Sequence, residues 1–169
     1  VAQTEIPRHL PDFAAGVRNA LRRKPNIILV GEARDKETIS AAIEAAQTGH
    51  AVYTTAHTTG VASTIRRMIS IFDSTEREER AYALMESIRL IVTQALVPKK
   101  GGGRMGIREW MRFPDEVREK FLDMDFDKWS VEIQRTIPKY GQTMQKSASD
   151  AFEDGHIERR WYLMLTAGN

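Results

Sequence analysis

The sequence predicts an α/β fold with a parallel or mostly parallel sheet, followed by a small all-helical subdomain. Two short apolar runs, at 26–30 and 51–55, flank a segment with helical spacing, which is the strand–helix–strand pattern of a parallel sheet. From Pro114 onwards, short helical segments rich in charged residues replace these runs. We therefore divide the 169 residues into an α/β part, 1–113, and a helical part, 114–169.

The first predicted elements are a helix and a strand. Apolar residues recur with helical spacing between Pro11 and Lys24, and Asp12 is a suitable N-cap. Pro25 disfavours the helical conformation of the residue before it and so ends this helix. Asn26–Val30 is an unbroken aliphatic run, typical of a strand that is buried on both faces.

Three further elements complete the predicted α/β unit. Residues 35–47 have helical spacing, and Gly49 is a suitable C-terminal cap. Ala51–Thr55 is rich in strand-forming residues and predicts a second buried strand. The segment Val61–Phe72 then predicts another helix, with its apolar residues on one side.

The remaining segments predict a long helix, a hairpin and the helical tail. A capping box of Thr75 and Glu78 would open a helix that extends to Ile91. The glycine-rich segment Pro98–Arg104 predicts a hairpin-like turn between two strands. Breaks between the helices of the tail are expected at Pro138, Gly141 and Gly155.

Composition excludes several classes of protein. The apolar fraction of 41% is sufficient for a packed core, and the net charge of +2 gives no reason to expect direct nucleic-acid binding. The absence of cysteine excludes disulfides, thiolate metal sites and cysteine nucleophiles. No apolar run is long enough to predict a transmembrane segment. Because the chain starts at Val1 instead of Met, we expect it to be part of a longer protein.

A carboxylate follows the first predicted strand. Glu32 lies just beyond Val30, at the edge of the sheet where parallel α/β proteins bind nucleotides. A carboxylate held there can orient Mg²⁺-bound or attacking water, and Gly31 leaves space beside it. The alternative is that a buried strand ends in Gly-Glu without any catalytic role.

Several polar residues follow the second predicted strand. Thr54, Thr55, His57, Thr58 and Thr59 would lie beside Glu32, where they could contact a terminal phosphate. Polar groups at the end of an apolar strand need hydrogen-bond partners. The alternative is that the threonines cap the next helix.

Together, residues 26–59 resemble the Walker B and His boxes of the PilT-like type II/IV secretion ATPases. The similarity covers nearly the whole chain and is greatest for the DotB/TraJ branch, which drives type IVB secretion and conjugation. Further matching segments are FAAGVRNALRRK at 13–24, Thr64 and Arg67, Phe72–Ser74, TQAL at 93–96, GGGR at 101–104, QTM at 142–144 and GHI at 155–157.

The resemblance implies a RecA-like P-loop NTPase core in 1–113, as the C-terminal half of a hexameric ATPase. This enzyme would couple ATP hydrolysis to type IV (type IVB) secretion or protein transport, conjugative transfer or pilus retraction, with ATP and Mg²⁺ as cofactors. The complete protein would be a homohexamer that works with the secretion or pilus machinery. It would be cytoplasmic and peripherally associated with the bacterial inner membrane.

The resemblance also implies roles for individual residues. Glu32 would be the Walker B carboxylate, acting on the attacking water and, through water, on Mg²⁺. His50 and His57 would be the two His-box histidines, near the γ-phosphate and the subunit boundary. Gly31 and Thr55, with His57, would contact the nucleotide.

Other matched positions have structural roles or depart from the family. For Arg34 and Asp35 the resemblance implies structural or intersubunit pairing and no role in the chemistry. In place of the AIRNLIRE-like motif of PilT proteins the chain has Pro114–Glu119, where only Val117 and Arg118 match. No Gly is followed by Lys, so the loop G-x-x-x-x-G-K-[ST] that holds phosphates is absent, and we expect the chain alone to be inactive.

Three other interpretations fit parts of the sequence. A metal-dependent hydrolase using Glu32, His50 and His57 lacks any short ligand spacing such as H-E-x-x-H. A RecA-type nucleic-acid motor is disfavoured by the nearly balanced charge. A non-enzymatic assembly or interaction module remains open for the chain alone.

Overall fold

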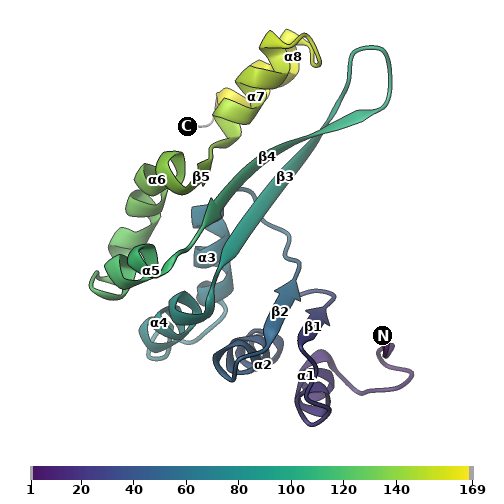
Figure 1. Cartoon of the computed structure of the whole chain (residues 1–169), viewed down its shortest axis with the longest axis vertical. Coiled ribbons are helices and arrows are strands. Elements are labelled where there is room, and N and C mark those ends of the chain that lie inside the picture. Colours follow the sequence, from purple (N-terminus) through teal and green to yellow (C-terminus); the bar gives the residue numbers. More distant parts are fainter. Residues whose placement is uncertain (1, 168–169) are drawn as a thin grey trace. The chain divides into compact units, whose positions relative to one another are not determined.

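The computed structural model describes residues 2–167, which form two compact units. The first unit contains the residues up to His57 together with Arg67–Ile88. The second unit contains Thr58–Arg66 together with the residues from Arg89 onwards. Figure 1 labels the helices and strands of both units.

The first unit contains the predicted strand–helix–strand element. Strand β1 (Ile27–Val30) and strand β2 (Ala51–Thr54) pair in parallel, with Val30 opposite Thr54. Helix α2 (Lys36–Gln47) connects the two strands. The predicted parallel pair with a helical crossover is therefore confirmed.

Side-chain caps fix where the first two helices begin. At the start of α1 (Phe13–Leu21), Asp12 Oδ1 accepts a hydrogen bond from Ala15 N–H at 2.6 Å. At the start of α2, Asp35 Oδ1 accepts one from Thr38 N–H at 2.8 Å. Each cap satisfies a backbone donor of the first turn, which typically contributes about 1 kcal/mol. Asp35 thus caps α2, and the pairing predicted for this residue stays a prediction.

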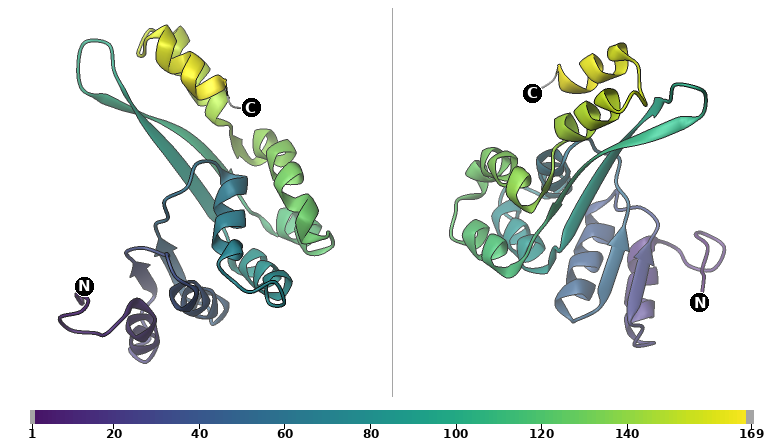
Figure 2. Two further views of the ribbon diagram at one scale, coloured as in Figure 1. Left: turned by 180° about the vertical axis from the view of Figure 1, so that it is seen from behind. Right: turned by 45° about the horizontal axis from the view of Figure 1, so that its top comes forward.

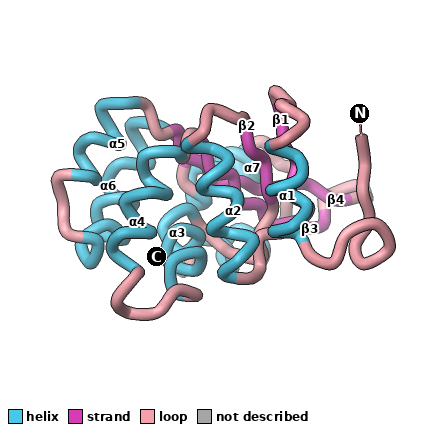
Figure 3. Tube along the Cα trace, turned by 90° about the horizontal axis from the view of Figure 1, so that it is seen from below, coloured by secondary structure: helices cyan, strands magenta, loops and turns pink. Residues whose placement is uncertain are grey.

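Only one face of the β1–β2 pair is covered. Ile28 and Val30 pack against small residues of α1 and α2, and both helices lie on the same side of the strands (Figure 3). Successive side chains of a strand point to opposite faces. Ile27, Leu29 and Tyr53 are accordingly 62%, 75% and 60% exposed. The prediction of strands buried on both faces is therefore wrong for this chain.

Helix α3 (Val61–Ser70) follows the segment after His57, as predicted, and its residues Val61, Ile65 and Ile69 are buried at helical spacing. Helix α4 (Arg77–Ser87) packs against α2.

The boundaries of two helices differ from the prediction. Helix α1 ends before Lys24, whose φ of 48° lies outside the helical region. Helix α4 ends before Ile91, which lies in a strand. The capping box predicted for α4 is also wrong, since the residue before its first turn is Glu76 and that side chain makes no cap hydrogen bond.

A long antiparallel hairpin forms the sheet of the second unit. Strand β3 (Leu90–Pro98) pairs with β4 (Arg104–Arg112) along its whole length, with Thr93 opposite Glu109. The predicted turn is confirmed: Gly101–Gly103 have φ values of 84°, 105° and 77°, which glycine adopts without steric cost.

The C-terminal part is helical, as predicted, with two corrections. Gly141–Gln142 forms a short strand, β5, that pairs with β4, so the part is not all-helical. A Cβ at Gly141 would lie 1.9 Å from the carbonyl oxygen of Trp110, so this close approach requires glycine. Pro138 lies inside a helix and does not end it.

The helical elements of the C-terminal part are α5 (Asp115–Leu122), η1 (Phe126–Lys128), α6 (Trp129–Tyr140), α7 (Met144–Glu153) and α8 (Arg159–Thr166).

Two apolar clusters stabilise the second unit. Trp129 is fully buried and meets Phe121 edge to face, with the ring centroids 5.8 Å apart. Near the turn of the hairpin, Val97 and Ile107 pack against small residues of α7, which lies beside the hairpin in Figure 2. The C-terminal helices are thus anchored on one face of the β3–β4 hairpin.

Candidate active site

The carboxyl ends of β1 and β2 bring the predicted site residues together. Gly31 and Glu32 follow β1, and Thr55 and His57 follow β2. Because the strands are parallel and in register at Val30, both segments leave the same edge of the sheet. Ligands of parallel α/β sheets bind at this edge.

Two hydrogen bonds hold these strand ends together. The hydroxyl group of Thr55 donates to the carbonyl oxygen of Gly31 at 2.5 Å. In return, the N–H group of Ala33 donates to the carbonyl oxygen of Thr55 at 2.9 Å. The backbone on either side of Glu32 is therefore tied to the backbone just before His57.

Glu32 and His57 face each other across this edge. Glu32 Oε1 lies 3.6 Å from His57 Nε2, and Glu32 Oε2 lies 4.0 Å from Arg34 Nη1. Both distances exceed that of a direct hydrogen bond. The Glu32 side chain is 32% exposed and that of His57 is 92% exposed, so both groups remain accessible to water or a ligand.

A hollow of about 300 Å³ lies beside this pair. Its lining includes Glu32, His57, Arg34 and Arg67, all of which belong to the first unit. The hollow thus presents one carboxylate that can accept a proton from water, together with cationic groups that can attract an anion.

Gly31 adjoins the pair without being required by packing. A Cβ at this position would meet only a ring carbon of Phe13, at an ordinary contact distance of 3.8 Å. A Cβ would therefore fit at position 31, and the predicted role of Gly31 beside the carboxylate and the nucleotide stays a prediction.

The structure does not bring His50 to this edge. His50 precedes β2, whereas Glu32 follows β1, so the two residues lie at opposite ends of the parallel pair. His50 Nδ1 lies 3.2 Å from the carbonyl oxygen of Ala45, near the end of α2. Its predicted role beside bound phosphate stays a prediction.

The threonines after β2 have mixed surroundings. Thr58 Oγ1 lies 2.8 Å from Thr64 Oγ1 of α3, and Ser63 donates to the carbonyl oxygen of Thr59. These contacts tie Thr58 and Thr59 to the first turn of α3, but neither is a hydrogen bond from a threonine side chain to a backbone N–H of that turn, so both interpretations of these threonines stay predictions. Thr55 instead holds the strand ends together and remains a candidate ligand-binding residue.

The side chains around Glu32 suit a metal ion that is bound through water better than a metal ion that the protein binds directly. Within residues 2–167 no group of three or more His, Cys, Asp or Glu side chains is placed to hold a metal. Glu32 alone could orient water bound to Mg²⁺, an ion that usually keeps several water ligands.

In the same range, residues 2–167, no helix is both long and apolar enough to cross a membrane.

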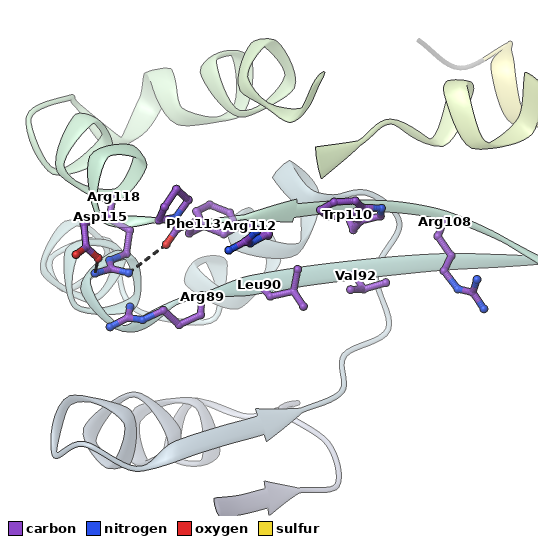
Figure 4. A pocket seen from close by; sticks show the side chains of 10 residues that line it. Arg89, Leu90, Val92, Arg108, Trp110, Arg112, Phe113, Asp115 and Arg118 are labelled. Atoms are coloured by element: carbon purple, nitrogen blue, oxygen red, sulfur yellow. Dashed lines mark hydrogen bonds and ion pairs between the residues drawn. The ribbon is translucent and has the colours of Figure 1, made fainter. Parts of the chain in front are cut away.

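A second hollow, of about 650 Å³, lies in the second unit (Figure 4). Arg118 Nη2 donates to Asp115 Oδ1 at 2.6 Å, and Arg118 Nη1 donates to the carbonyl oxygen of Phe113 at 3.1 Å. Burial lowers the pKa of the nearby Arg89 guanidinium, and the charge of Arg118 lowers this pKa further. Sequence reasoning missed this hollow, because its arginines are scattered between 89 and 118.

Residues 1–101 match the model of the family described as type II/IV secretion system protein. The chain belongs to this family. The match covers both strand ends of the candidate site. Three relatives show how far the likeness extends.

The chain is 45% identical over 111 residues to the type IV pilus retraction ATPase PilT of Pseudomonas aeruginosa, covering 66% of the chain and 32% of the relative. It is 50% identical to the Legionella pneumophila ATPase DotB, with a TM-score of 0.95 over 100% of the chain and 46% of that structure. A structure of the retraction motor PilT with bound ADP is 32% identical, with a TM-score of 0.85 over 98% of the chain and 47% of that structure.

These similarities confirm the predicted resemblance to PilT-like ATPases and to DotB. They also confirm the predicted α/β fold with a parallel sheet and a helical C-terminal part. The chain spans less than half the length of each of these three relatives.

Proposed function

We propose that this chain is the part of an ATP-hydrolysing secretion or pilus motor that supplies the water-orienting carboxylate. The observation that carries the proposal is the Glu32–His57 pair, accessible at the carboxyl ends of two parallel strands. Relatives named as ATPases, one of them with bound ADP, support it.

Glu32 is the proposed catalytic carboxylate. It accepts a hydrogen bond from the attacking water and orients that water toward the terminal phosphate. When bound, ATP supplies the phosphoryl group and Mg²⁺ neutralises its developing charge. Because Glu32 makes no close hydrogen bond to His57 or Arg34, its oxygens keep lone pairs for water.

His57 is proposed to contact the γ-phosphate, and Gly31 and Thr55 to border the nucleotide. The imidazole of His57 is exposed and lies 3.6 Å from Glu32 Oε1, so it can approach a phosphate placed beside this carboxylate. His50 lies at the other end of β2 and is proposed to act at a subunit boundary.

We further propose that the longer protein binds its phosphates with a G-x-x-x-x-G-K-[ST] loop, a pattern absent from these 169 residues. In that protein, 1–113 would belong to the RecA-like ATPase domain and 114–169 would form the helical C-terminal subdomain. The complete protein would be a homohexamer at the cytoplasmic face of the inner membrane, where it drives secretion, conjugation or pilus retraction.

The proposal is tested by comparing this chain with the longer protein that contains it. Steady-state phosphate release and nucleotide binding are measured for both proteins at equal concentration. We expect hydrolysis only in the longer protein, because the chain alone lacks the phosphate-binding loop. The proposal fails if the longer protein neither binds nor hydrolyses ATP, which would favour an assembly module.

A further inference from the structure

Glu109 is a buried carboxylate in the second unit, remote in sequence from the proposed active-site residues. The residue is only 8% exposed, and it lies on the covered face of β4 together with Ile107 and Met111. Its Oε1 accepts a hydrogen bond from Val61 N–H at 2.7 Å, and its Oε2 accepts one from Met144 N–H at 3.3 Å. These two donors belong to the first residues of α3 and α7.

Two helix N-termini therefore stabilise one carboxylate. A buried charge is costly unless it is paired or hydrogen-bonded. Within residues 2–167, Glu109 forms no ion pair with Lys, Arg or His, so the partial positive charges of the helix ends take that role. Hydrogen bonds to an ionised acceptor are also stronger than neutral ones.

The loop before α3 rests against the same part of the hairpin. Gly60 N–H donates to Thr93 Oγ1 at 3.3 Å, and Thr93 is opposite Glu109 in the β3–β4 register. Gly60 has a φ of 88°, and a Cβ there would lie 3.3 Å from Glu109 Oε1. The position of this loop and that of the carboxylate therefore depend on each other.

We propose that Glu109 is a positioning residue that couples the loop after His57 to helix α7. The two helix starts share one rigid carboxyl group, so a shift of the loop moves the carboxylate and weakens its bond to Met144. His57 precedes Gly60 by three residues. The inference rests on the proposed function in one respect. If ATP hydrolysis moves His57, the loop after it shifts the Glu109 carboxylate and so affects the C-terminal helices.

The test compares Gly60→Ala with Gly101→Ala in this chain, by amide hydrogen exchange. Both glycines have positive φ, but a Cβ at Gly101 would meet no atom within 4 Å. We expect Gly60→Ala to speed exchange at 143–147 roughly tenfold, because a buried hydrogen bond is weakened. Gly101→Ala should leave 143–147 unchanged. Exchange in α6, a helix of the same unit, should stay constant in both variants.

The inference is overturned if Gly60→Ala speeds exchange at 61–64 but not at 143–147. It is also overturned if α6 loosens to the same extent, since the effect would then be a general loss of stability.

A second comparison uses Glu109→Gln, with the exposed Glu119→Gln as the control. The amide has one acceptor oxygen where the carboxylate has two, so the two backbone donors can no longer each keep an oxygen of their own. Exchange should therefore rise at 61–64 or at 143–147, and a rise at neither contradicts the inference. These measurements need no nucleotide, so their failure would leave the proposed ATPase activity untouched.

Discussion

Glu32 and Glu109 are two carboxylates of the same chain with opposite surroundings. Glu32 stands at an open sheet edge, with its nearest charged partners at 3.6 and 4.0 Å. Glu109 lies within a strand, and backbone N–H groups hold its oxygens at 2.7 and 3.3 Å. A carboxylate with free lone pairs can serve a ligand or water, whereas one whose oxygens are already bound serves the fold.

Other polar side chains of the two units show the same contrast between buried, hydrogen-bonded groups and exposed ones. In the second unit the polar side chains of Thr93, Glu109 and Thr136 are buried, and each has a hydrogen-bond partner. In the first unit, His57 is almost fully exposed at the sheet edge. These buried polar groups of the second unit are thus satisfied within the fold, whereas His57 of the first unit stays accessible to a ligand.

The largest effect on stability is expected from Trp129→Ala in the second unit. Removing this fully buried ring should destabilise the unit by about 3–5 kcal/mol. Urea unfolding monitored by circular dichroism measures the change, and Leu163→Ala, on an exposed part of α8, is the control. A loss below about 1 kcal/mol would contradict the assignment of Trp129 to the core.

The next largest difference in stability is expected between substitutions of the two carboxylates. Glu109→Ala leaves two helix-start N–H groups without acceptors and should cost about 2–3 kcal/mol. Glu32→Ala should change stability by no more than about 0.5 kcal/mol, since no close hydrogen bond is lost. Equal losses of stability in the same unfolding measurement would contradict the different surroundings of the two carboxylates.

The smallest losses of stability are expected from substitutions in strand β1. Ile28→Val, on the covered face, should cost about 1 kcal/mol, and Leu29→Val, on the exposed face, less than about 0.5 kcal/mol. The comparison is made with this chain, again by urea unfolding. A larger loss at Leu29 than at Ile28 would show that the exposed face is covered in solution.

Local patterns in the sequence predicted much of the first unit. Unbroken apolar runs ending in polar residues identified β1 and β2, and the helical crossover required them to be parallel. This is why Glu32 and His57 could be predicted to lie together. His50 is close to His57 in sequence, but the length of β2 separates them in space.

Pairing between distant segments could not be read from local patterns. Ile91 fits a helix by spacing, yet it pairs with Met111 in the hairpin, where β-branched residues pack well. Strand β5 has only two residues and depends on β4 for its partner. For Glu109 a signal did exist: a charged residue alternates with the apolar Ile107 and Met111, which places it on the covered face of the strand.

The central claim is that Glu32 orients the attacking water, and Glu32→Gln in the longer protein tests it most directly. Steady-state phosphate release is measured together with nucleotide binding. We predict that binding persists while turnover falls roughly a hundredfold or more, because the amide cannot accept the proton of the water. His57→Ala should reduce turnover more mildly, since a phosphate contact assists charge stabilisation. Turnover by Glu32→Gln near the parental rate would contradict the assignment.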